Sequence, residues 1–96
     1  MNIQKMMQQA QAMQSKMQTE LAAMKIEASA GGGMVTVAMS GAKEVLSVQI
    51  DPACVDSDDV SMLQDLVLAA CREASRRVDE AVQQKTAALL TGMMPR

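Results

Sequence analysis

The stretch from residue 31 to residue 52 most limits what this chain can fold into, because it holds nearly all of the alternating, β-branched sequence. Apolar side chains fill every second position over 35–39 and again over 46–50. Alternation with a period of two is typical of half-buried strands. Ser40-Gly41 separates the two runs, and Asp51-Pro52 ends the second, because proline cannot donate to a sheet ladder. We therefore predict two antiparallel strands joined by a short turn.

A weaker alternating run precedes them over residues 25–30, with Ile26, Ala28 and Ala30 on one face. Three consecutive glycines, residues 31–33, supply the backbone freedom that a tight connection to the next strand needs. The three runs together predict a three-stranded antiparallel meander. A sheet this small has two exposed edges and one apolar face, so we expect it to need both a cover and a partner.

Residues 1–24 predict a long helix. One face of this helix is an apolar stripe. The opposite face carries six glutamines, Lys5, Lys16 and one acid, Glu20. This polar face is either simply solvated or a surface for phosphates, because amide and ammonium groups both donate to phosphate oxygens. The residues of the apolar stripe recur mostly at spacings of three and four, the period of an amphipathic or coiled-coil seam. They are Ile3, Met6, Ala10, Met13, Met17 and Met24.

A second long helix is predicted over residues 58–90, begun by Ser57 or Asp58 as N-cap and ended by Gly92. Acids at its start suit the helix dipole, so the aspartate-rich stretch around residue 58 is interpreted as helix initiation rather than as a metal site. The helix has an apolar stripe formed by Leu63, Leu66, Val67, Ala70, Ala74, Val78 and Ala81.

Three arginines on this helix have more than one interpretation. Arg77 lies four residues after Glu73, and Arg76 lies four residues before Glu80, so both arginines can form ion pairs within the helix. If either arginine does not form its ion pair, it is available to contact a phosphate. Arg72 lies on the side opposite the apolar stripe, and we expect it to face solvent.

The helix lengths favour a dimer. At 1.5 Å per residue the two helices are roughly 33 and 50 Å long, whereas a compact monomer of this size has a radius of gyration of about 12 Å. Helices of these lengths overhang the small sheet and leave apolar stripes uncovered. Dimerisation through the sheet and helix faces covers them, and Val48 is expected to lie in the resulting core.

Composition excludes several functions. The 96 residues predict one domain and contain no histidine, which removes the commonest general base and the commonest zinc ligand. The two cysteines lack CxxC spacing, and neither has an evident activating base. We therefore predict a non-enzyme without cofactor, metal or small-molecule substrate. No apolar run reaches the length of a membrane span, and the N-terminal residues lack the apolar region of a signal peptide, so we expect a cytosolic protein that does not contact membranes.

The charge pattern bears on nucleic-acid binding. The net charge of −2 is unlike that of a generic nucleic-acid binder. Five aspartates form an acidic block without a basic residue in it, and the remaining charges are nine positive and six negative. The chain thus has an acidic end and a mildly basic remainder. No aromatic residue is present, which excludes the stacking platforms that bind single strands.

The order and spacing of these segments resemble the YbaB/EbfC family of bacterial nucleoid-associated proteins over nearly the whole chain. The resemblance rests on Gln9-Ala10-Gln11 with Met13-Gln14 and Met17-Gln18, Gly32-Gly33-Met34-Val35, Gly41, Val48, Ile50-Asp51-Pro52, Met62-Leu63, Asp65-Leu66-Val67, Ala69-Ala70, Ala74, Arg76-Arg77 and Thr91-Gly92-Met93.

The resemblance implies an α-β-α fold that dimerises through its sheets, with paired helices projecting like the arms of a tweezer and DNA bound between or along them. We therefore expect a nucleoid-located homodimer that binds duplex DNA with little sequence preference. If the two helices run antiparallel, Lys85 is expected to come close to Lys5. The candidate phosphate contacts are Lys5, Lys16, Lys85, Arg72, Arg76 and Arg77. The alternative is a protein-interaction module whose methionine-lined cleft clasps a partner helix, since methionine adapts to irregular surfaces.

Overall fold

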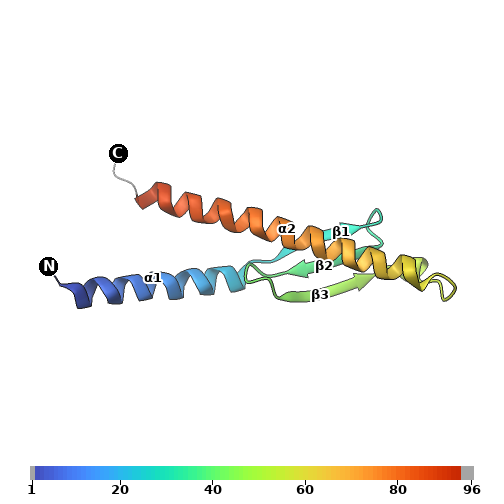
Figure 1. Ribbon diagram of the computed structural model, residues 1–96, viewed down its shortest axis with the longest axis horizontal. Coiled ribbons are helices and arrows are strands. Elements are labelled where there is room, and N and C mark those ends of the chain that lie inside the picture. The colour runs from blue at the N-terminus through green and yellow to red at the C-terminus, as the bar shows by residue number, and fades with distance from the viewer. Residues whose placement is uncertain (1, 94–96) are drawn as a thin grey trace.

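The computed structural model describes residues 2–93, and its elements follow the predicted order (Figure 1). A long N-terminal helix, a three-stranded antiparallel sheet and a long C-terminal helix confirm the expected α-β-α order, which is an α+β fold. A single 3₁₀ turn joins the sheet to the last helix. The elements are α1 (Ile3–Ala23), β1 (Ile26–Ala30), β2 (Val35–Met39), β3 (Val45–Ile50), η1 (Pro52–Cys54) and α2 (Val60–Met93).

The sheet is a meander in the order β1-β2-β3, and both pairs of neighbours are antiparallel. Val37 on the central strand lies opposite Ala28 on one side and Val48 on the other. Residues directly opposite in an antiparallel pair point to the same face. The glycines at 31–33 all have positive φ, between 65° and 97°, which is why three of them form the β1–β2 turn.

The core lies between α2 and one face of β1 and β2, as Figure 1 shows. Val35 and Val37 on β2 are fully buried, and the helix meets them through Ala70, Ala74 and Val78, each at most 1% exposed. Two alanines one turn apart let the helix axis approach the strands closely. The apolar stripe predicted for the second helix is therefore confirmed as its packing face over this middle stretch.

β3 is left uncovered, because α2 crosses β1 and β2 and leaves the third strand beside it (Figure 1). Val45, Leu46, Val48 and Ile50 are between 39% and 52% exposed. Val48 is predicted to lie in the core that dimerisation would form, and in the single chain its side chain is accordingly uncovered. Its side chain extends the apolar face of β2 beyond the edge of the helix and lies open to a partner.

The molecule is much longer than a compact chain of its size. It measures 68 × 26 × 16 Å, and its radius of gyration is 18.8 Å against the roughly 12 Å of a compact domain. The accessible surface is 7203 Å², whereas a compact monomer of this mass exposes about 5,300 Å². None of the described side chains of α1 is buried. The excess surface comes from the projecting helices and the open side of β3.

α1 is attached to the sheet at its C-terminal end by the β2–β3 turn. The Gly41 N–H donates to the Leu21 carbonyl over 2.9 Å, and Gly41 is buried there. A Cβ on Gly41 would come within 2.7 Å of the Leu21 carbonyl oxygen and 3.1 Å of the Met24 sulfur. Backbone fills that space, so no side-chain movement can relieve the contact.

Gly41→Ala should therefore destabilise the protein by about 1–3 kcal/mol, the usual cost of overpacking. The melting temperature should fall by about 4–8 °C per kcal/mol. Thermal unfolding followed by circular dichroism measures this. An unchanged melting temperature would mean that the turn does not anchor α1 at this point.

Both predicted ends of the second helix differ from those in the structure. α2 begins at Val60, so Asp58 and Asp59 precede the helix and do not form its first turn. Asp59, rather than Ser57 or Asp58, acts as the cap, because its Oδ1 accepts from the Met62 N–H over 3.2 Å. The helix also continues past Gly92 to Met93, since one glycine weakens a helix without ending it.

Candidate nucleic-acid interface

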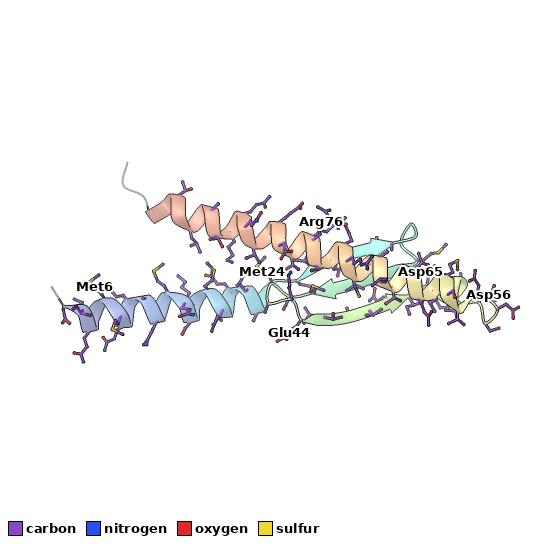
Figure 2. All side chains as sticks on the ribbon, in the orientation of Figure 1. Met6, Met24, Glu44, Asp56, Asp65 and Arg76 are labelled. Atoms are coloured by element: carbon purple, nitrogen blue, oxygen red, sulfur yellow. The ribbon has the colours of Figure 1, made fainter. Side chains whose placement is uncertain are left out.

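The charges of the chain are separated along its long axis. We call α1 and residues 81–93 of α2 the arms, and residues 24–80 the body. The arms carry three basic residues and one acid, whereas the body carries five basic residues and ten acids, giving formal charges of +2 and −5. Asp56 and Asp65 lie at the end of the molecule remote from Met6, as Figure 2 shows. A polyanion approaching this molecule is attracted to the arms and repelled by the body.

Lys5 and Lys16 project from α1 into solvent. They are eleven residues apart, which is close to three helical turns, so they lie on one side of the helix about 16 Å apart. Neither has an ion-pair partner within residues 2–93. Both are therefore available to an anion, and they remain candidates for phosphate contact.

Lys85 lies on the other arm, opposite Glu20 of α1. Its Nζ is 3.4 Å from the Glu20 carboxylate. The prediction that it would come close to Lys5 is wrong, because Lys5 lies about 22 Å farther along α1 from Glu20. The two helices do run roughly antiparallel (Figure 1). However, more than half of α2 covers the sheet, so only its last turns lie beside α1. These turns begin level with the C-terminal end of α1, which is attached to the sheet.

Arg76 is held by two carboxylates on its own helix, those of Glu73 and Glu80. This confirms the predicted pair with Glu80 and adds a second partner. Hydrogen bonding to Glu73 is the main reason that the pKa of Arg76 is raised above its ordinary value. The guanidinium of Arg76 already pairs with two carboxylates, which a phosphate would have to displace. Arg76 is therefore a poor candidate for phosphate contact.

Arg77 also has a structural role. Its Nε donates to Glu73 over 3.1 Å, as predicted, and its Nη1 donates to the backbone carbonyl of Glu27 on β1 over 2.9 Å. The second bond ties α2 to the edge strand of the sheet. Helical spacing could not reveal it, because residue 27 is fifty positions away in the sequence. Arg77 therefore positions the helix on the sheet.

Arg72 faces solvent, as predicted, and forms no ion pair with the described residues. It lies in the body, however, with the acids there outnumbering the bases two to one. The structure thus separates the six candidates into unpaired Lys5 and Lys16, paired Lys85, two arginines with structural partners, and Arg72 on the acidic body.

The Glu73 network predicts a measurable pH dependence. Hydrogen bonding from Arg76, helped by Arg77 and opposed by desolvation, lowers the pKa of Glu73 from 4.5 to about 2. A lowered folded pKa contributes stability that is present above pH 4.5 and lost as the pH falls towards 2. Glu73→Gln should therefore reduce the melting temperature by a few degrees at pH 7, and the difference from wild type should shrink between pH 4.5 and 2.5.

Glu44→Gln is the matched control, since Glu44 is exposed and has no ion-pair partner within the described residues. Its melting temperature should follow that of the wild type throughout. A gap between wild type and Glu73→Gln of equal size at pH 2.5 and pH 7 would contradict the assignment.

Two apolar hollows lie outside the core. One, of about 140 Å³, lies between the arms and is lined by Met13, Lys16, Met17, Glu20 and Leu89. The other, of about 450 Å³, is an open groove between β3 and α2, lined by Ile50, Leu63, Gln64, Val67, Leu68 and Cys71. The groove adjoins the uncovered strand, so the two form one apolar surface.

Two further observations concern the described part of the chain only. Across residues 2–93, no group of three or more histidine, cysteine, aspartate or glutamate side chains is arranged to hold a metal ion. Neither α1 nor α2, over the lengths described, has a segment apolar enough to span a bilayer.

The sequence model of the YbaB/EbfC DNA-binding family matches residues 1–93 of this chain. A nucleoid-associated protein of Koribacter versatilis (strain Ellin345) is 50% identical over 92 residues, which cover 96% of this chain and 91% of that protein. A nucleoid-associated protein of Clostridium novyi (strain NT) is 50% identical over 96 residues, covering 97% and 84% respectively.

The fold has a counterpart among solved structures. The crystal structure of an uncharacterised protein from Helicobacter pylori is similar with a TM-score of 0.77, at 20% identity and over 92% of each chain. At that identity the likeness shows the fold alone. The family match and the relatives at 50% identity show the family as well as the fold: this chain belongs to the YbaB/EbfC DNA-binding family, and the bacterial relatives that it matches are nucleoid-associated proteins.

Proposed function

We propose that residues 1–96 act as one domain that binds duplex DNA as a homodimer, with little sequence preference, in the bacterial nucleoid. One observation carries this proposal. The arms have a formal charge of +2 on a chain whose body is at −5, and Lys5 and Lys16 project from α1 without ion-pair partners in the described residues. Charges gathered on a projecting helix are where a polyanion makes its first contacts.

Contacts of this kind do not depend on base sequence. A lysine ammonium is a compact charge that binds backbone phosphates, and phosphate contacts position a protein on DNA without reading its bases. The chain has no tryptophan, tyrosine or phenylalanine on which single-stranded bases would stack. Duplex DNA is therefore the favoured ligand, and Arg72 is at most an accessory contact.

The dimer is supported by the surface that the single chain leaves open. The accessible area exceeds that of a compact monomer by about 1,900 Å², more than the roughly 800 Å² that each partner buries in a standard interface. The exposed edge of β3 and the groove beside it form one continuous apolar surface. Two-fold symmetry would double the unpaired lysines on the arms from two to four.

Fluorescence anisotropy with two short duplexes of unrelated sequence tests the proposal. Both duplexes should bind with similar affinity, and the affinity should fall steeply between about 50 and 200 mM salt. A mass measurement at the same concentration should give twice the chain mass. Failure to bind either duplex at low salt would contradict the proposed function.

A second candidate is favoured by the exposed seam of α1. Ile3, Met6, Met7 and Met13 are between 49% and 69% exposed, and a helix without packing partners is only marginally stable in water. An amphipathic partner helix could cover these residues and enter the hollow between the arms. Absence of duplex binding, together with specific binding of such a helix, would favour this function over the first.

A further inference from the structure

Glu20 is the only acidic residue in the arms, counted over residues 2–23 and 81–93, and it lies against one of their three lysines. The Glu20 Oε2 and Lys85 Nζ atoms are 3.4 Å apart, and both side chains are about one-third exposed. Over the described residues, no other ion pair or hydrogen bond joins α1 to α2. One contact thus both neutralises a third of the positive charge of the arms and connects them.

We propose that Glu20 competes with DNA phosphate for Lys85 and so limits how tightly the arms bind a duplex. The inference rests on the proposed function. Carboxylate and phosphate are both oxyanions that accept from a lysine ammonium, and the ammonium has three donors on a flexible stem. Because the pair is partly exposed, water and salt weaken it. A phosphate can therefore reach Lys85 and take its proton donors away from Glu20.

The position of Glu20 distinguishes it from the other acids. Ten acidic residues lie in the body, and those at its far end are remote from the arms (Figure 2). Charges farther apart than about 10 Å are largely screened at 0.1 M salt. Removing a distant carboxylate should therefore leave the arms unaffected, whereas removing Glu20 releases a lysine at the surface that meets DNA.

The experiment compares salt-dependent duplex affinity for wild type, Glu20→Gln, Lys85→Ala and the double variant. Asp65→Asn is the control, because it also replaces a helical carboxylate by an amide, but Asp65 is exposed and lies in the acidic body. Fluorescence anisotropy with a short labelled duplex is measured between about 50 and 200 mM NaCl. Circular dichroism of each variant shows that the helices are retained.

Glu20→Gln should bind about three- to tenfold more tightly at the lowest salt concentration, and its log–log salt slope should be steeper by about 0.9 per protomer, the effect of one added phosphate contact. Asp65→Asn should match wild type. In the Lys85→Ala background, Glu20→Gln should change the affinity little, because the lysine that it releases is absent.

Three results would overturn the inference in distinguishable ways. Duplex binding by wild type that Glu20→Gln leaves unchanged or weakens would remove Glu20 as a competitor and leave the proposed function intact. An equal gain from Glu20→Gln with and without Lys85 would show general repulsion of DNA by Glu20. Absence of binding by wild type and Glu20→Gln alike would overturn the proposed function and this inference together.

Discussion

Replacing both Lys5 and Lys16 by alanine is expected to weaken duplex binding on the order of one hundredfold at low salt. In a dimer the double substitution removes four phosphate contacts, so the log–log salt slope should flatten by about 3.6. Both lysines are exposed and unpaired within the described residues, so the melting temperature should scarcely change. The loss should be equal for duplexes of unrelated sequence, since phosphate contacts carry no sequence information.

Lys25→Ala with Lys43→Ala is the matched control, because it removes the same charge from the body. There Lys25 pairs with Glu27 and Lys43 with Asp79. This control should bind DNA nearly as well as wild type. If both double variants lost affinity equally, net charge rather than the position of the arms would govern binding, and the candidate interface would be wrong.

Val48→Asp is expected to convert the protein into a folded monomer that no longer binds DNA appreciably. Val48 is 44% exposed in the single chain, so a carboxylate there can remain hydrated while the protein is monomeric. In a dimer that buries β3, two such charges would lie close together and unpaired, which is strongly destabilising. Sedimentation equilibrium measures the mass, and circular dichroism measures whether the helices remain.

Val37→Asp provides the comparison, because Val37 lies directly opposite Val48 in the sheet but is fully buried under α2. An unpaired charge there costs an amount comparable with the whole stability of a small domain, so this variant should unfold. A Val48→Asp protein that remains a dimer with an unchanged melting temperature would show that β3 lies outside the interface.

The strands and the helix faces could be predicted from sequence because each has apolar residues that repeat at a regular local spacing. Val35 and Val37 alternate with polar or small residues, and Ala70, Ala74 and Val78 recur every four, so their burial follows from spacing alone. The pairs of Arg76 and Arg77 with glutamates on the same helix were predictable for the same reason.

The location of Lys85 was not predictable, because a helical period identifies the packing face but not which stretch of the helix covers the sheet. The register of α2 on the strands is set by tertiary contacts, and it places Lys85 level with Glu20 rather than with Lys5. Alternation likewise marks Val48 as belonging to an apolar face, but it does not tell whether the same chain or a partner covers that face; in the single chain Val48 is exposed. The helix cap was misplaced because neighbouring positions all suit a cap, and Asp59 is the one used.

The hydrogen bond from Arg77 to the Glu27 carbonyl bears on how large an assembly of this chain can become. β1 and β3 are the two borders of the sheet, and the guanidinium is bonded to the backbone of the first. A strand seeking to extend the sheet beside β1 would have to compete with that side chain, whereas β3 carries no such obstruction in the described residues. If two copies pair through β3, as proposed above, neither border of the sheet remains free for a further copy, and association would stop at a closed pair instead of growing into a fibre.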